Sequence, residues 1–153
     1  MKPRCIPGNA YTVTTRACAP NAPANADAAA TTISGSVAPT LSLTLGAPAT
    51  FGAFTPGVGK SYTATTTATV ISTAGDGAIT VADPSTNKTG YLVNGSFALA
   101  QPLQGLGLVK SYSGPVSNDA VPITFTQAIG QSEPLRTGTY GKALTFTLST
   151  TNP

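Results

Sequence analysis

The most regular pattern in the chain is a period-two alternation of hydroxyl and apolar side chains between residues 61 and 73. Because successive side chains of a β-strand point to opposite faces, this alternation predicts one long strand whose apolar face lies against a core. The threonine face then meets solvent, although a row of hydroxyl groups could also contact ice or a sugar. The threonines are Thr63, Thr65, Thr67 and Thr69, and the apolar residues between them are Tyr62, Ala64, Ala68 and Val70.

Shorter apolar segments follow one another along the rest of the chain, separated by Gly, Pro, Asn and Asp. Short segments of this kind, bounded by turn residues, are typical of all-β domains. Asn94-Gly95 is in addition a signal for a tight hairpin. We therefore predict an all-β fold, an Ig-like antiparallel β-sandwich of about eight or nine strands with an extended N-terminal segment. The predicted strands are 31–37, 41–46, 49–54, 61–73, 78–83, 90–100, 108–114, 120–127 and 140–150.

The chain divides into three zones by composition. Residues 1–18 form an N-terminal stub bounded by cysteines, residues 19–30 form an Ala/Pro/Asn linker, and residues 31–153 form the β-sandwich domain. The linker has no large apolar side chain, so it cannot bury enough surface to offset the entropy lost on ordering. Cys5 and Cys18 predict a local disulfide, the alternative being two free thiols.

Charge is sparse: 8% of the residues are charged, and the formal net charge is +3. The basic residues are scattered singly, whereas a nucleic-acid surface needs clustered Lys and Arg, so no nucleic-acid partner is predicted. The basic opening residues have no apolar run behind them, so no signal peptide is expected there, and no segment approaches the length of a membrane span. A charge-poor chain without histidine, rich in Thr, Gly and Ala, favours a secreted or cell-surface location.

Four long phrases after Ser34 carry a resemblance to known domains. They are LSLTLGAPATFGAFTPGVGKSYTATTTATVISTAGD (41–76), LVNGSFALAQPLQ (92–104), GPVSNDAVPITFTQAIG (114–130) and LRTGTYGKALTFTLSTTNP (135–153). Together they resemble a domain found at the C-terminus of secreted, multi-modular proteins of actinobacteria. The layout is distantly similar to the WxL cell-wall-binding domain, and the last phrase resembles the ending of spore coat protein U type pilus subunits.

This resemblance implies an Ig-like β-sandwich with a non-catalytic role at a surface or cell wall. The WxL motif requires tryptophan, and this chain has none. Phe146, Thr147 and Leu148 stand where the second motif has Trp-x-Leu. We therefore infer no binding residue from that motif.

The residue inventory excludes most catalytic and metal sites. Without histidine, the chain has no Ser-His-Asp or Cys-His machinery, and no catalytic residue, metal or cofactor is predicted. Asp83 and Asp119 could form a carboxylate pair, or a calcium site with Asp76 and Asn118, but their neighbours favour turn residues. Lys142 could in principle donate to an intramolecular cross-link with an asparagine, although a solvated or snorkelling lysine is the favoured interpretation.

Aromatic residues are the candidates for glycan contact. Tyr62 and Tyr140 lie on apolar faces and are predicted to belong to the core, whereas Tyr91 and Tyr112 are better placed to be exposed. We predict a non-catalytic accessory or structural module that anchors, spaces or assembles a surface protein, with other modules or copies of itself as partners. The alternative is a carbohydrate- or cell-wall-binding module.

Overall fold

The computed structural model describes residues 31–151, and it divides the chain into two units, Met1–Ser36 and Val37–Pro153. The predicted stub, the whole predicted linker and the Cys5–Cys18 disulfide lie outside the described residues. Residues 31–37 are described and contain no strand, so the strand predicted there is wrong. Their apolar side chains are exposed, Ile33 by 93% and Val37 by 81%. The next strand pairs with a partner that ends opposite Leu41, so no ladder is present for earlier residues to join.

The all-β prediction is confirmed, with eight strands in residues 31–151 and no helix among them. That part of the chain accordingly holds no helix long and apolar enough to cross a membrane. The strands are β1 (Leu41–Leu45), β2 (Lys60–Ser72), β3 (Gly77–Ala82), β4 (Val93–Asn94), β5 (Phe97–Ala98), β6 (Gly107–Tyr112), β7 (Val116–Ile129) and β8 (Thr145–Ser149).

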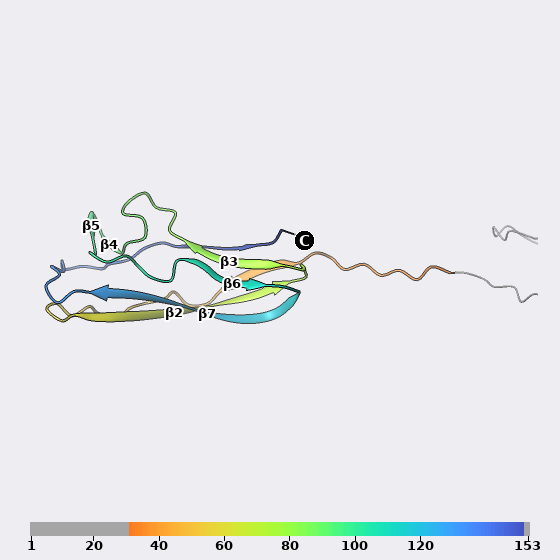
Figure 1. Cartoon of the computed structure of the whole chain (residues 1–153), viewed down its shortest axis with the longest axis horizontal. Coiled ribbons are helices and arrows are strands. Elements are labelled where there is room, and N and C mark those ends of the chain that lie inside the picture. The colour runs from red at the N-terminus through yellow and green to blue at the C-terminus, as the bar shows by residue number, and fades with distance from the viewer. Residues whose placement is uncertain (1–30, 152–153) are drawn as a thin grey trace, which may run out of the picture. The chain divides into compact units, whose positions relative to one another are not determined.

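The strands form two three-stranded antiparallel sheets and one small hairpin. The first sheet has the order β1-β2-β7 and the second the order β6-β3-β8, while β4 pairs only with β5. Figure 1 shows β2 and β7 as one long layer, with β3 and β6 above it. The hairpin predicted at Asn94-Gly95 is present, and Gly95 adopts the positive φ of 61° that such a turn favours.

Apolar residues from both sheets meet in one core. Val70 and Ile79, from the middle strands of the two sheets, are fully buried, and Val81, Ile123 and Phe125 are at most 3% exposed. Each such side chain stabilises the folded state by about 1.5–3 kcal/mol relative to an exposed position. This shared core holds the two sheets together.

The alternation in β2 has the predicted orientation. Tyr62, Ala64, Ala68 and Val70 are buried, whereas Thr63, Thr65 and Thr67 are exposed and Thr69 is partly so. Tyr62 belongs to the core cluster, and Tyr140 packs against it, as predicted. The threonine ladder is thus the solvent face of a strand whose other face is buried.

Residues 49–54 do not form the predicted strand. Gly52 has a φ of 70°, which turns the backbone away from the extended conformation. Phe51 and Phe54 on either side still pack against the core, and the Phe54 ring meets the Tyr62 ring edge-on at a centroid distance of 4.9 Å. The aromatic residues suggested a strand, but here they cover the core from an irregular segment.

Strand β7 begins at Val116, earlier than the predicted boundary at 120. Asn118 and Asp119 were expected to lie in a turn. Instead Asn118 adopts a φ of 54° where the pairing of β2 with β7 shifts register. Asn tolerates this left-handed conformation, so the strand continues through a bulge rather than ending in a turn.

Candidate functional site

Strand β1 is an edge strand whose outer side is not hydrogen-bonded to another described strand, although β8 of the second sheet lies near it. Its inner side pairs with β2, from Leu41 opposite Ser72 to Leu45 opposite Ala68, and no other strand among the described residues pairs with its outer side. The N–H of Gly46 donates to the carbonyl of Thr67, so the even-numbered residues here direct their backbone groups toward β2. The N–H and C=O groups of Leu41, Leu43 and Leu45 therefore point to the open side.

The side chains of β1 offer little protection for this edge. Natural edge strands usually carry Lys, Pro or a bulge that discourages pairing with another chain. The sequence LSLTL has no charge and no proline, and its pairing with β2 is regular. Leu41 and Leu45 are 46% and 44% exposed. Strand β1 is thus an apolar edge strand whose outer backbone groups have no strand partner among the described residues.

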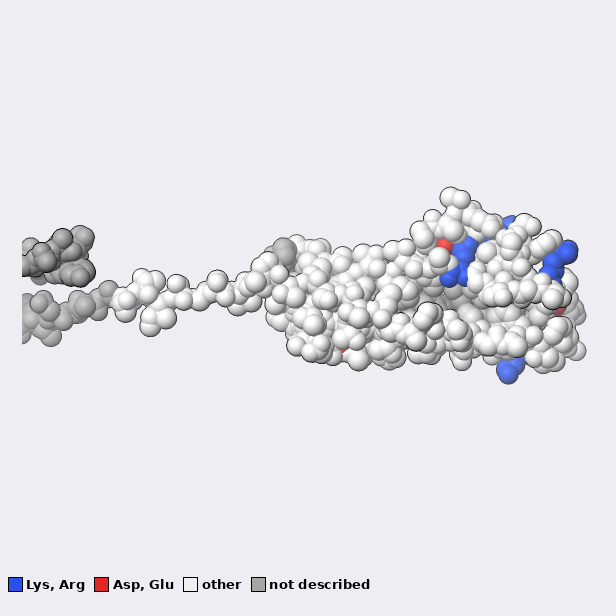
Figure 2. Space-filling model, turned by 180° about the vertical axis from the view of Figure 1, so that it is seen from behind, with Lys and Arg blue, Asp and Glu red and all other residues white. Residues whose placement is uncertain are grey.

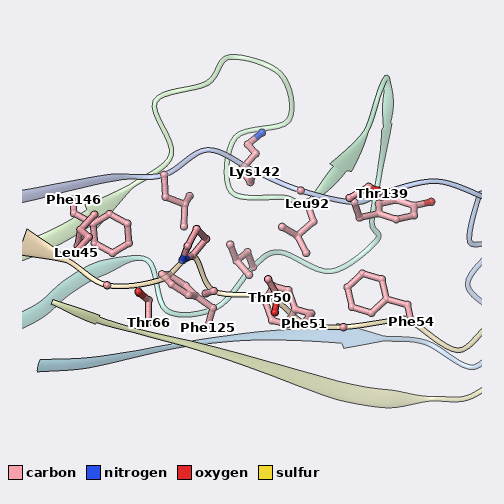
Figure 3. Close-up of a pocket in the computed structure, with 18 residues that line it drawn as sticks. Leu45, Thr50, Phe51, Phe54, Thr66, Leu92, Phe125, Thr139, Lys142 and Phe146 are labelled. Carbon is pink, nitrogen blue, oxygen red and sulfur yellow. The ribbon is translucent and has the colours of Figure 1, made fainter.

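A cleft of about 640 Å³ lies beside the end of β1 (Figure 3). One wall is the irregular segment from Gly46 to Phe54, and the opposite wall is the segment from Thr139 to Phe146 that leads into β8. Leu92, Leu103 and the Phe125 ring of β7 also line it. The sequence pattern does not predict this cleft, because strands at 49–54 and 140–150 would leave no irregular walls.

Aromatic rings form much of the cleft surface. The Phe51 and Phe54 centroids are 6.0 Å apart on one wall, and the Phe125 and Phe146 centroids are 6.3 Å apart where β7 meets β8. All but Phe125 are only partly buried. The cleft therefore presents apolar surface to solvent, supplemented by Thr50, Thr66 and Thr139.

A buried ion pair fixes one side of the cleft. The Lys142 Nζ atom lies 3.1 Å from Asp83 Oδ2, and the two side chains are only 4% and 0% exposed. Lys142 also donates hydrogen bonds to the carbonyl oxygens of Asn87 and Lys88. The prediction of a solvated or snorkelling Lys142 is therefore wrong. Lys142 lies two residues before Leu144 and, like it, points into the protein. Loop carbonyls replace water around its ammonium group.

The environment of Asp83 keeps it ionised. Burial alone raises the pKa of this carboxyl, but the N–H groups of Gly90 and Ser85 and the Lys142 ammonium outweigh burial, so the pKa lies well below its ordinary range. The bond from the Ser85 N–H to Asp83 Oδ1 is the turn contact expected of an aspartate before Pro84. An ionised Asp83 beside a charged Lys142 makes a structural clamp.

Asp119 and Tyr112 form a second polar cluster. The Lys110 Nζ lies 2.6 Å from Asp119 Oδ2, and the Tyr112 hydroxyl donates to the same oxygen at 2.7 Å. These bonds lower the pKa of Asp119, while burial and the neighbouring carboxylate raise the pKa of Tyr112. Tyr112 pairs with Gly77 at the start of β3, whereas Asp83 follows the end of β3, so Asp83 and Asp119 do not form a carboxylate pair.

No group of three or more acidic, His or Cys side chains that could hold a metal occurs in the described part of the chain. Asp76, the third acidic residue considered for calcium, accepts hydrogen bonds from Thr150 and Thr151. The three aspartates considered for calcium are therefore each engaged in other polar contacts.

The two tyrosines predicted as glycan contacts are not brought together. Tyr112 lies on β6 at the Gly77 end of the second sheet, and Tyr91 lies beyond the other end of β3, after Gly90. Both are partly buried, and the Lys110 ammonium lies 5.1 Å from the Tyr112 ring centroid. A shared stacking platform would need the two rings side by side.

The threonines of β2 have matching partners on β7. Thr63 is opposite Thr126, and Thr65 is opposite Thr124, with 3.4 Å between the Oγ1 atoms of the second pair. On the face seen in Figure 2, the Lys and Arg side chains gather mainly at one end of the domain. The outer face of the first sheet is thus a hydroxyl surface stabilised by cross-strand pairs.

Comparison with known proteins adds no identity, because no family model, curated protein or solved structure matches the chain. The resemblance to actinobacterial, WxL and spore coat domains therefore stays a prediction.

Proposed function

We propose that this domain is a non-catalytic accessory module of a secreted or cell-surface protein, and that it assembles with a second copy through the outer edge of β1. The observation that carries the proposal is the unprotected edge of β1, with its half-exposed leucines. Strand addition to such an edge gains main-chain hydrogen bonds together with burial of alternate side chains.

The other edges of the two sheets are less suited to pairing. Strand β6 carries Lys110, and β7 is interrupted by the bulge at Asn118 and by a bridge from Gln104 to Thr126. Strand β8 is uncharged, but its Phe146 and Leu148 side chains are packed against the core. Strand β1 alone among these edge strands combines a regular backbone, no charge and exposed large apolar side chains.

Carbohydrate or cell-wall binding remains the alternative prediction. It would be supported by aromatic rings converging beside polar groups, and Tyr91 and Tyr112 lie at opposite ends of β3. For this reason assembly is the preferred function.

Light scattering during size-exclusion chromatography tests the proposal. The full chain should form a dimer that dissociates on dilution. Leu41→Lys should yield a monomer, because a lysine beside the edge opposes pairing. Leu108→Lys is the matched control: Leu108 is 67% exposed on β6, and this variant should still dimerise. A monomeric wild-type chain at every concentration, or equal behaviour of the two variants, would contradict the proposal.

Removal of residues 1–38 separates two routes to assembly. If β1 is the contact, the shortened chain should still associate. Its conversion to a monomer, with unchanged circular dichroism, would place the contact in the N-terminal segment instead and would reject β1 as the interface.

A further inference from the structure

The cleft between the segment 46–54 and the segment 139–146 has the form of a small-molecule site. Its volume of about 640 Å³ lies within the range of roughly 300–1,000 Å³ that is usual for ligand pockets. Such pockets are lined mainly by apolar and aromatic side chains with a few polar groups. Here four phenylalanines and four leucines line the cleft, together with a few hydroxyl-bearing side chains.

The charge distribution restricts the ligand. Lys142 is the one charged residue that lines the cleft within the described structure. Its ammonium group is engaged by Asp83 and by the carbonyl oxygens of Asn87 and Lys88, and Figure 3 shows it directed away from the apolar side chains. The cleft therefore offers no free cation to an anionic ligand and no carboxylate to a cationic one.

The backbone of the walls argues against a peptide as occupant. An extended peptide in a groove needs main-chain partners along its length. The wall from Gly46 to Phe54 contains no strand, and its hydrogen bonds to β2 run from the Gly46 N–H to the Thr67 carbonyl and from the Thr66 hydroxyl to the Ala47 carbonyl. A compact apolar molecule needs no such ladder and can occupy the space between the rings.

Two threonines define where the polar part of such a ligand would lie. Thr50 and Thr139 belong to opposite walls, and both are exposed. Their hydroxyl groups can donate or accept a hydrogen bond. A hydroxyl or carbonyl on the ligand would thus meet a neutral partner, while its hydrocarbon part would contact Phe51 and Phe146.

We propose that this cleft binds a small, neutral, mainly hydrocarbon molecule with a hydroxyl or carbonyl group. The site adjoins the end of β1, where Leu45 lines it, but the proposal does not depend on assembly.

Fluorescence titration of the full chain with the neutral probe N-phenylnaphthylamine tests the site. Binding should be saturable at one site per chain with a blue-shifted emission. Dodecanol should displace the probe at least about tenfold more effectively than dodecanoate, because the cleft has no free cation to offset desolvation of the carboxylate. Equal displacement by the two compounds would overturn the inference of a neutral ligand.

Blocking variants locate the binding. Thr50→Trp should fill the cleft from one wall and weaken probe binding by about tenfold or more, and Thr139→Trp should do so from the other. Thr65→Trp, on the exposed outer face of β2, is the matched control and should bind like the wild type. Equal affinity in all three variants, or no saturable binding to the wild type, would overturn the site.

The Leu41→Lys variant distinguishes this proposal from the assembly function. It should retain probe binding even where it abolishes the dimer. Loss of both properties in folded Leu41→Lys protein would show that the probe reports the interface between copies, and it would overturn the assignment of a separate ligand site.

Discussion

The two halves of β2 are one continuous strand with different neighbours. Ala68 to Ser72 lie between β1 and β7, whereas Lys60 to Thr67 pair in a ladder with β7 alone. Beside residues 60–67 runs the irregular segment that forms a wall of the cleft. Their alternation is nearly the same, so the difference is one of partners rather than of strand propensity.

On the side away from β7, residues 60–67 are held by hydrogen bonds of individual side chains. The Thr66 hydroxyl donates to the Ala47 carbonyl at 2.8 Å, and the Tyr62 hydroxyl accepts the Thr55 N–H at 2.9 Å. At residues 68–72, a series of backbone hydrogen bonds to β1 holds that side of the strand instead. A single substitution should therefore cost more stability among the irregular segments than at residues 68–72, where β2 has a strand on each side.

The largest difference is expected between two aspartates. Asp83→Asn removes the charge that compensates buried Lys142, which should lower the free energy of unfolding by about 3–5 kcal/mol. Asp119→Asn affects a pair whose side chains are 41% and 31% exposed, so a much smaller loss is expected. Urea denaturation of both variants measures the contrast. Equal losses of unfolding free energy in the two variants would contradict the expected difference between the buried Asp83 pair and the exposed Asp119 pair.

Two glycines give the next contrast. Gly105 and Gly107 share a φ of 100°, so alanine at either position is strained by about 1–3 kcal/mol. A Cβ at Gly105 would also lie 2.6 Å from the Thr124 carbonyl oxygen, whereas one at Gly107 would have no neighbour within 4 Å. Gly105→Ala should therefore have the lower melting temperature. A lower melting temperature for Gly107→Ala would show that the backbone around Gly105, which lies against β7, is free to shift.

Acid should weaken the clamp around Asp83. Its pKa is depressed from an ordinary value of 3.8, so its contribution to stability is complete above about pH 4 and is lost as pH falls below that value. The free energy of unfolding, measured in urea from about pH 7 to pH 2, should fall at the acid end. Asp83→Asn should show a shallower fall, with the remainder due partly to Asp119. An identical pH dependence in the variant would exclude Asp83 as a cause.

The smallest effect concerns neighbouring threonines of β2. Thr66→Val keeps the shape of the side chain and removes the bond to Ala47, which should cost about 1 kcal/mol. Thr67→Val changes an exposed position, and its effect should stay within about 0.5 kcal/mol. Thermal unfolding compares the two. A neutral Thr66→Val would mean that the cleft wall is held by its phenylalanines instead.

The sequence was informative where side-chain alternation decides the structure. Tyr62, Ala64, Ala68 and Val70 identified the buried face of β2, because a slip by one residue would expose all of them. Asn94-Gly95 likewise identified a turn from local backbone preference. These features depend on neighbours in the sequence and on one buried face.

Prediction failed where a distant partner decides the outcome. Phe51 and Phe54 look like strand residues, but Gly52 turns the backbone and the rings pack inward from a loop. Nothing near Lys142 in the sequence indicates Asp83 or the loop carbonyls that receive its ammonium group. The two-residue spacing between Lys142 and Leu144 was the one indication that Lys142 points inward. The general tendency of lysine to remain solvated outweighed it. The cleft was missed for the same reason, since its walls come from segments about ninety residues apart.

An assembly through the outer edge of β1 would be limited in size. If two copies align β1 antiparallel to β1, a two-fold axis relates them and both three-stranded sheets merge into one continuous sheet. Such an isologous contact occupies the same surface on each copy and leaves none for a third. Growth into a filament would require a different, head-to-tail contact, so a finite pair is the geometry that this edge favours.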